Sequence, residues 1–228
     1  MHALTVALIA LAALCYAAGV HRLWRRAGQG RGIARCHAAA FAAGIALLAL
    51  AVLSPLHEAA ETLLWAHMIQ HELLMVVAAP LLVLGRPLQA FAHVLPLRMP
   101  RLLSDPLFAW TAHAAAIWLW HLPAAFDAAL GSELWHFAQH ASFLVSAILF
   151  WWTIVARADL AAVLSLFGTM VYTGALGALL AFARTPWYAG FALDDQQLAG
   201  LIMWVPAGLA YPAAALLIAS QWLRRSAA

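Results

Sequence analysis

The sequence predicts an all-α, polytopic membrane protein, a bundle of seven transmembrane helices with its N-terminus outside and its C-terminus in the cytoplasm. Only 9% of the 228 residues are charged and 66% are hydrophobic, whereas an average soluble domain is ~25% charged. The mean hydropathy is +0.88, and the apolar residues gather into runs of about 20, the length that crosses a bilayer as a helix. We therefore expect one transmembrane domain over residues 1–228.

Seven apolar runs define the expected helices in chain order. They cover residues 3–20, 37–53, 62–84, 106–122, 134–155, 160–182 and 197–220. The first run has no positive charge before it, which indicates a retained span and not a cleaved signal. Pro80 should bend the third helix, because proline removes a backbone hydrogen bond. Turn-forming residues separate the runs at Ser54-Pro55, Gly85-Arg86-Pro87 and Ser104-Asp105-Pro106.

The arginines predict the topology, and they are the only basic residues besides histidine. Eleven of the twelve lie in alternate connections and in the C-terminal tail, and only Arg184 lies on the other side. They are Arg22, Arg25, Arg26, Arg31, Arg35, Arg86, Arg98, Arg101, Arg157, Arg224 and Arg225. Cytoplasmic loops are enriched in arginine, so these connections are expected inside. Arginines spread over short loops indicate a lipid bilayer as partner and no nucleic acid.

Two histidine pairs inside apolar runs, His67/His71 and His136/His140, are the main candidate for a functional site. An i,i+4 spacing places both imidazoles on one helix face. Polar residues inside a bilayer usually mark a site, and imidazole is the commonest metal ligand. The topology brings six histidines to the outer third of the membrane: His57, His67, His71, His121, His136 and His140. We predict a metal site of these residues, with His57 as an additional ligand.

Copper is the expected metal and zinc the second choice, because imidazoles without thiolates suit both. The two cysteines, Cys15 and Cys36, form no metal-binding motif. Thioethers at a similar depth would favour Cu(I), and they belong to Met68, Met75 and Met203. Three carboxylates could orient the imidazoles: Glu72, Asp194 and Asp195.

Two other functions stay open at this stage. Paired imidazoles from facing helices could bind haem in a membrane redox protein. A metal or proton transporter would need polar groups down to the cytoplasm, but the inner half is mostly alanine, leucine and valine. His113, Thr169 and Tyr172 are sparse exceptions. No nucleophile or phosphate-binding motif is present, so no enzyme is expected.

Five stretches between about residues 50 and 210 resemble the CtaG family of bacterial cytochrome c oxidase assembly factors. They are His67-Met68-Ile69-Gln70-His71, the run from Ala79 to Pro87, Trp120-His121-Leu122-Pro123, His136-Phe137-Ala138-Gln139-His140, and the run from Asp195 to Trp204. Gln139 departs from the acidic residue that the family resemblance leads us to expect before the second histidine.

The resemblance implies a multi-pass protein of the bacterial cytoplasmic (inner) membrane. Such a protein is needed to form the copper centre in the catalytic subunit of a haem–copper oxidase. The implied partner is that catalytic subunit, and copper uptake at an outer histidine site would add a periplasmic copper donor. The family's histidine motifs fall on His67, His71, His121, His136 and His140.

Overall fold

The computed structural model describes residues 2–94 and 101–226, and all regular elements in this part of the chain are helical. Arg98, used above for the topology, lies outside the described residues. The long helices are α1 (His2–Ala27), α2 (Arg35–Leu53), α7 (Pro106–Trp120), α9 (Glu133–Arg157), α10 (Leu160–Ala181) and α11 (Leu193–Ser226). The short ones are α3 (Pro55–Ala60), α6 (Pro87–Phe91), α8 (Pro123–Leu130) and the 3₁₀ helix η2 (Arg101–Ser104).

The third predicted span is one continuous rod made of three pieces. These are α4 (Leu64–Glu72), the π-helix η1 (Leu73–Ala78) and α5 (Ala79–Leu84). Together with α1, α2, α9, α10 and α11, this rod makes six helices that are long and apolar enough to cross a membrane. The chain therefore has the character of a multi-pass membrane protein. The fourth predicted span corresponds to α7, which has 15 residues and is shorter than a typical span of ~20.

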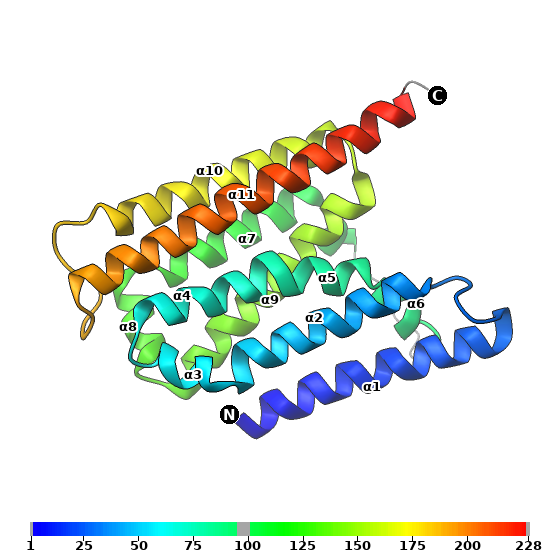
Figure 1. Cartoon of the computed structure of the whole chain (residues 1–228), viewed down its shortest axis with the longest axis horizontal. Helices are drawn as coiled ribbons and strands as arrows, with labels where there is room; N and C mark the ends of the chain where they lie inside the picture. The colour runs from blue at the N-terminus through cyan, green and yellow to red at the C-terminus, as the bar shows by residue number, and fades with distance from the viewer. Residues whose placement is uncertain (1, 95–100, 227–228) are drawn as a thin grey trace.

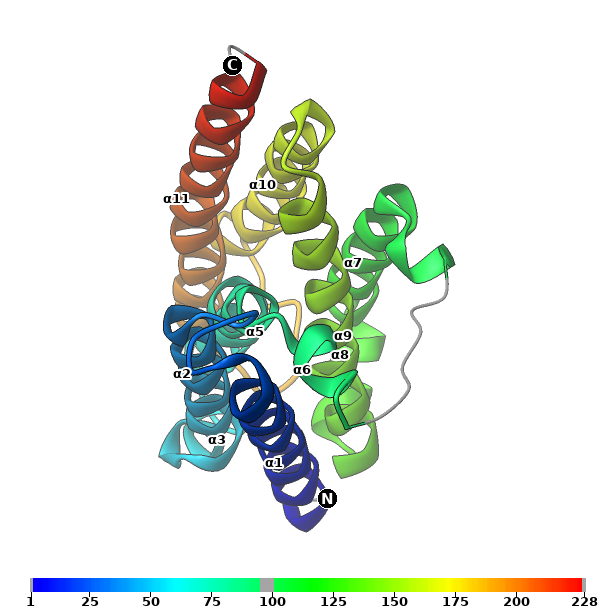
Figure 2. The same cartoon turned by 90° about the vertical axis from the view of Figure 1, so that its right-hand side faces the viewer.

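The connections gather at two ends of the bundle (Figure 1). The N-terminal end carries the N-terminus, α3, α8 and the connection from α10 to α11. The C-terminal end carries α6, the connections from α1 to α2 and from α9 to α10, and the C-terminus. In the end-on view of Figure 2, α5 lies near the middle of the bundle with α2 and α9 beside it. The segments that bear the histidine pairs, residues 64–84 and α9, are the two most buried of the six candidate spans.

The π-helix has a local cause in Pro80. The Ala79 amide bonds back to the Leu74 carbonyl, five residues earlier, which leaves the Met75 carbonyl facing Pro80. Proline has no N–H to donate to it. The indole Nε1 of Trp151 on α9 donates a hydrogen bond of 2.9 Å to the Met75 carbonyl instead. A side chain of the neighbouring helix thus supplies the donor that the sequence of the rod lacks.

Helices α10 and α11 pack closely through glycine. A Cβ added at Gly200 would lie 2.5 Å from the Ala181 amide and 2.6 Å from the Gly177 carbonyl. Only glycine allows the two backbones to approach this far, which is how small residues serve helix contacts in membranes. This contact sets the position of α11, whose first turn meets the rod at α4.

Candidate metal centre

A contact from α11 fixes the first turn of α4, the helix that carries His67 and His71. Leu63, which precedes the helix, has no polar side chain to cap it. The Asp195 carboxylate accepts hydrogen bonds from the backbone amides of Leu64 (2.9 Å) and Trp65 (3.0 Å). A negative charge at a helix N-terminus is favourable because it satisfies free N–H groups and opposes the helix dipole. His67 and His71 follow on the next turns.

Three imidazoles form the centre of the site. Ring nitrogens of His67, His71 and His140 all lie within 4.8 Å of one another. The ring centroids of His71 on α4 and His140 on α9 are 5.3 Å apart, and the rings are nearly perpendicular. His67 and His71 are 0% and 2% exposed, so water is excluded from this face of α4. The two predicted pairs therefore meet across facing helices.

His121 joins this centre from the end of α7, with its ring 5.7 Å from that of His71. Its Nδ1 lies 2.7 Å from the Ile117 carbonyl, which can only accept, so Nδ1 carries the proton. The buried Nε2 then keeps a free lone pair, and no described residue bonds to it. The Tyr188 hydroxyl donates to the His121 carbonyl at 2.9 Å and ties the α10–α11 connection to this site. Burial raises the pKa of Tyr188, so its hydroxyl stays a donor at neutral pH.

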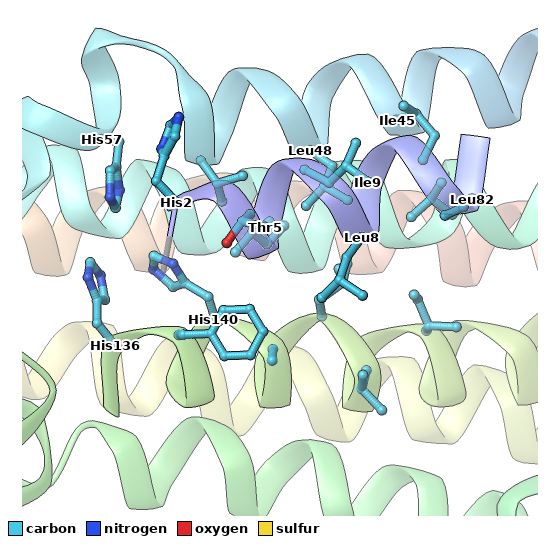
Figure 3. Close-up of a pocket in the computed structure, with 18 of the residues that line it drawn as sticks. His2, Thr5, Leu8, Ile9, Ile45, Leu48, His57, Leu82, His136 and His140 are labelled. Atoms are coloured by element: carbon cyan, nitrogen blue, oxygen red, sulfur yellow. The ribbon is translucent and has the colours of Figure 1, made fainter. Parts of the chain in front are cut away.

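His136 and His57 continue the cluster toward its edge. The His136 ring stacks on His67 at 5.4 Å, and the His57 ring stacks on His136 at 5.5 Å. Figure 3 shows His57 and His136 facing each other, with His140 beside them. All six histidines that the topology placed at one depth are thus in one connected group. Below, "the histidine cluster" means His57, His67, His71, His121, His136 and His140.

Aromatic side chains surround the centre of the histidine cluster. The Phe143 ring lies 4.6 Å from His71, and the Phe126 ring lies 5.1 Å from His67. Both phenylalanines are fully buried. In this apolar surrounding both ring nitrogens of His71 have no hydrogen-bond partner among the described residues.

The structure places the other residues predicted for the site in different surroundings. Met68, Met75 and Met203 are buried in the main hydrophobic core. Asp194 is exposed, and Asp195 bonds to the backbone of α4 and not to an imidazole. Glu72 is buried, and its carboxylate bonds to no histidine among the described residues.

His113 is separate from the histidine cluster. Its Nδ1 lies 3.1 Å from the Ser146 hydroxyl, and its ring stacks on Phe150. This agrees with the polar packing role that a lone histidine in a span usually has.

Two buried glutamines belong to the site and were not predicted as part of it. Gln70 donates from Nε2 to the Ala51 carbonyl at 2.6 Å, and the same atom lies 3.2 Å from Nδ1 of His57. Gln139 is fully buried between His136 and His140 in sequence, and its amide has no bonding partner in the described chain. The signal was present in the sequence: both pairs read His-x-x-Gln-His, so each second histidine follows a glutamine.

The chemistry of the histidine cluster follows from its free nitrogens. Both ring nitrogens of His71 and the Nε2 atoms of His121, His136 and His140 are buried with no partner in the described residues. An unsatisfied buried polar atom costs about 1–3 kcal/mol, and several at one point require a reason. Two ligands of one ion, each bound at ~2 Å, lie up to ~4 Å apart. Nitrogens within 4.8 Å of one another need only small side-chain rotations to reach that spacing.

The fold and the site define an all-helical membrane protein with a buried cluster of histidines suited to a metal ion. The family model of the cytochrome c oxidase caa3 assembly factor (Caa3_CtaG) matches residues 14–225, and the chain belongs to this family. Comparison with curated proteins and with solved structures found no match.

Proposed function

We propose that this protein binds copper at the histidine cluster and passes it to the catalytic subunit of a cytochrome c oxidase during assembly. The observation that carries the proposal is the meeting of His67, His71 and His140 within 4.8 Å, with buried nitrogens free to bind a metal. Membership of the oxidase assembly factor family supports a role of this copper site in the assembly of the oxidase. The copper ion is cargo in this proposal, and the protein is not an enzyme.

The donor set favours copper over other metals. Three to five imidazoles with no thiolate and no carboxylate suit copper first and zinc second. Carboxylate-preferring ions are disfavoured, because the Asp195 carboxylate is engaged at the start of α4. His121 would present Nε2 in its neutral tautomer, which is the form a metal needs.

Delivery requires that copper can enter and leave, and the histidine cluster offers a graded set of ligands. His57 and His136 are partly exposed, whereas His67 and His71 are buried. A donor would first meet His57 and His136, and ligand exchange along stacked imidazoles would move the ion inward. Protons compete with the metal for each imidazole, so affinity should fall as the pH falls.

We further propose seven crossings, with α7 as the fourth and the N-terminal end of the bundle on the periplasmic side. Helix α7 begins after η2 and leads to α8 at the N-terminal end, and the two chain termini lie at opposite ends (Figure 1). The described arginines other than Arg184 belong to the last turns of α1, to the connections α1–α2, α5–α6 and α9–α10 with their flanking residues, to η2 and to the last turn of α11. The positive-inside rule assigns such arginine-bearing connections to the cytoplasm. The histidine cluster would then open toward a periplasmic copper donor in the bacterial inner membrane.

The two alternatives receive less support from the packing. A haem between the pairs would have to displace Phe126 and Phe143, which contact the imidazoles directly. A transport path would have to continue past His71, where Leu74, Met75 and Ala78 are buried and apolar.

Joint replacement of His71 and His140 by alanine tests the proposal. Purified variant protein should lose bound copper, and cells that carry it should make an oxidase that contains haem but lacks copper at its active centre. The His113→Ala variant is the matched control, because it removes a buried imidazole outside the histidine cluster.

Three results would count against copper delivery. Normal copper content in the oxidase would exclude a role for the cluster. A purified wild-type protein that contains zinc and no copper would mean that the bound metal is zinc. A Soret band in the purified protein, lost in the double variant, would support haem binding.

A further inference from the structure

Gln70 of α4 is fully buried and contacts the histidine at the edge of the cluster. Its Nε2 atom lies 2.6 Å from the Ala51 carbonyl of α2 and 3.2 Å from Nδ1 of His57 on α3. One side-chain amide thus joins the helix that carries His67 and His71 to the end of α2 and to His57. Together the two contacts fix which nitrogen of His57 carries the proton.

The Ala51 carbonyl is free to accept a hydrogen bond from Gln70 because of a proline. In an α-helix this carbonyl would accept from the backbone amide of residue 55. That residue is Pro55, which begins α3 and has no N–H. Since a carbonyl can only accept, the amide nitrogen of Gln70 must point toward it, and Oε1 must point away. The contact with α2 therefore sets the orientation of Gln70 independently of His57.

The orientation of Gln70 decides the tautomer of His57. An amide NH₂ group has two protons to donate and cannot accept, so Nδ1 of His57 must be the acceptor. A neutral imidazole with an accepting Nδ1 carries its proton on Nε2, and neither nitrogen then has a free lone pair for a metal. His121 has the opposite arrangement, because its Nδ1 donates to the Ile117 carbonyl and leaves Nε2 free.

Given the copper-binding function proposed above, on which this rests, we propose that Gln70 is a positioning residue that makes His57 a weak copper ligand. Copper could bind His57 only by displacing the Gln70 N–H from Nδ1 or by removing the proton from Nε2. The His136 ring stacks on His57, and its buried Nε2 has no partner among the described residues. Copper that reaches the edge of the cluster should therefore move from His57 to His136 and inward.

A packing role of Gln70 alone would give different results. Packing requires only the bond to Ala51, which holds α2 against α4. Loss of that bond would lower the stability of the protein without fixing a new tautomer of His57. The protonation of Nδ1 and the dependence of copper affinity on His57 therefore distinguish the two roles.

The first test measures the tautomer of His57 in the purified, metal-free, full-length protein in detergent. NMR of protein labelled at histidine with ¹⁵N distinguishes protonated from unprotonated ring nitrogens, and the His57→Ala variant identifies the signals of His57. We expect an unprotonated Nδ1 in the wild type. Gln70→Glu should reverse this, because a carboxyl oxygen can accept from a protonated Nδ1 whether or not the other oxygen donates to Ala51.

The second test measures copper affinity by competition with a chromophoric Cu(I) chelator. The proteins are the wild type, His57→Ala, Gln70→Glu and the double variant. His57→Ala should cost about tenfold more affinity in the Gln70→Glu background than in the wild type, the lower end of the ~10–100-fold usual for groups that orient metal ligands. Gln70→Leu removes the donor without adding charge. It should increase the cost of His57→Ala in the same direction, and it replaces Gln70→Glu if that variant does not fold.

Gln197→Glu is the matched control for the Gln70 variants. Gln197 of α11 also donates from Nε2 to a backbone carbonyl, that of Ala183 at 3.1 Å. In this variant the tautomer of His57 and the cost of His57→Ala should both equal those of the wild type.

Two results would overturn the proposal for Gln70. One is a protonated Nδ1 of His57 in the metal-free wild type, and the other is an equal cost of His57→Ala in the wild type and in the Gln70 variants. A wild-type protein that binds no copper would contradict the proposed copper-binding function instead. The NMR spectrum of the metal-free protein would still decide whether Gln70 fixes the tautomer of His57.

Discussion

Asp195, at the start of α11, accepts a hydrogen bond of 2.9 Å from the backbone amide of Leu64, at the start of α4. The two residues are 131 positions apart in the chain. The contact couples the last helix of the bundle to the helix that carries His67 and His71. It gives α4 the cap that its own sequence does not provide, because Leu63 has no polar side chain.

Replacement of Asp195 by alanine should destabilise the protein by about 0.5–2 kcal/mol, the usual effect of losing a helix cap. It should also weaken metal binding, since the first turn of α4 positions His67. Denaturant unfolding in detergent and copper titration would measure the two effects. The neighbouring variant Asp194→Ala is the control, because that side chain is exposed. Equal effects of the two variants would mean that the cap does not position the histidines.

Replacement of Gly200 by alanine should destabilise the protein, because the new Cβ would press on the backbone of α10 at Ala181 and Gly177. Overpacking of this kind typically costs about 1–3 kcal/mol. Gly208→Ala, on the same helix, should be neutral or slightly stabilising, since a Cβ there has open space and alanine favours a helix. Thermal unfolding of the two variants side by side measures the difference, and a similar melting temperature for both would refute close packing of α10 and α11.

Replacement of Trp151 by phenylalanine should remove the donor to the Met75 carbonyl while keeping an aromatic ring. We expect a loss of about 0.6–1.5 kcal/mol, in line with single hydrogen bonds in membranes and in buried sites. The control is Trp152→Phe, whose indole makes no hydrogen bond in the described part of the chain and is only partly buried. Unfolding curves that coincide for both variants would show that the π-helix does not depend on this donor.

Reporter fusions test the orientation of the bundle. Fusions at Arg101 and Asp127 lie on either side of α7, and they should report the cytoplasm and the periplasm respectively. The reason is the eleven-to-one division of the arginines in the sequence. Both fusions on the same side would show that α7 does not cross the membrane, and would leave six crossings.

The helical class and most of the spans could be predicted because they depend on local properties of the chain. Apolar runs of sufficient length appear directly in the sequence, and six of them correspond to helices long enough to cross a membrane. The boundary of α7 could not be predicted in the same way. Its apolar run continues to residue 122, but the helix ends at Trp120 and the chain turns before Pro123 into α8.

The features of the candidate site can also be separated into those that local sequence predicts and those that the packing of helices decides. An i,i+4 spacing places two imidazoles on one helix face whatever the rest of the molecule does, so the sequence by itself determined the pairs His67/His71 and His136/His140. Only the tertiary structure decided that Asp195 caps α4 and that the Trp151 indole bonds to the Met75 carbonyl of the π-helix. These relations depend on the tilt and rotation of whole helices, which are set by distant contacts such as Gly19 with Ala90 and Gly200 with Gly177. No pattern within one helix encodes them, because helix spacing is decided by the side chains of both partners.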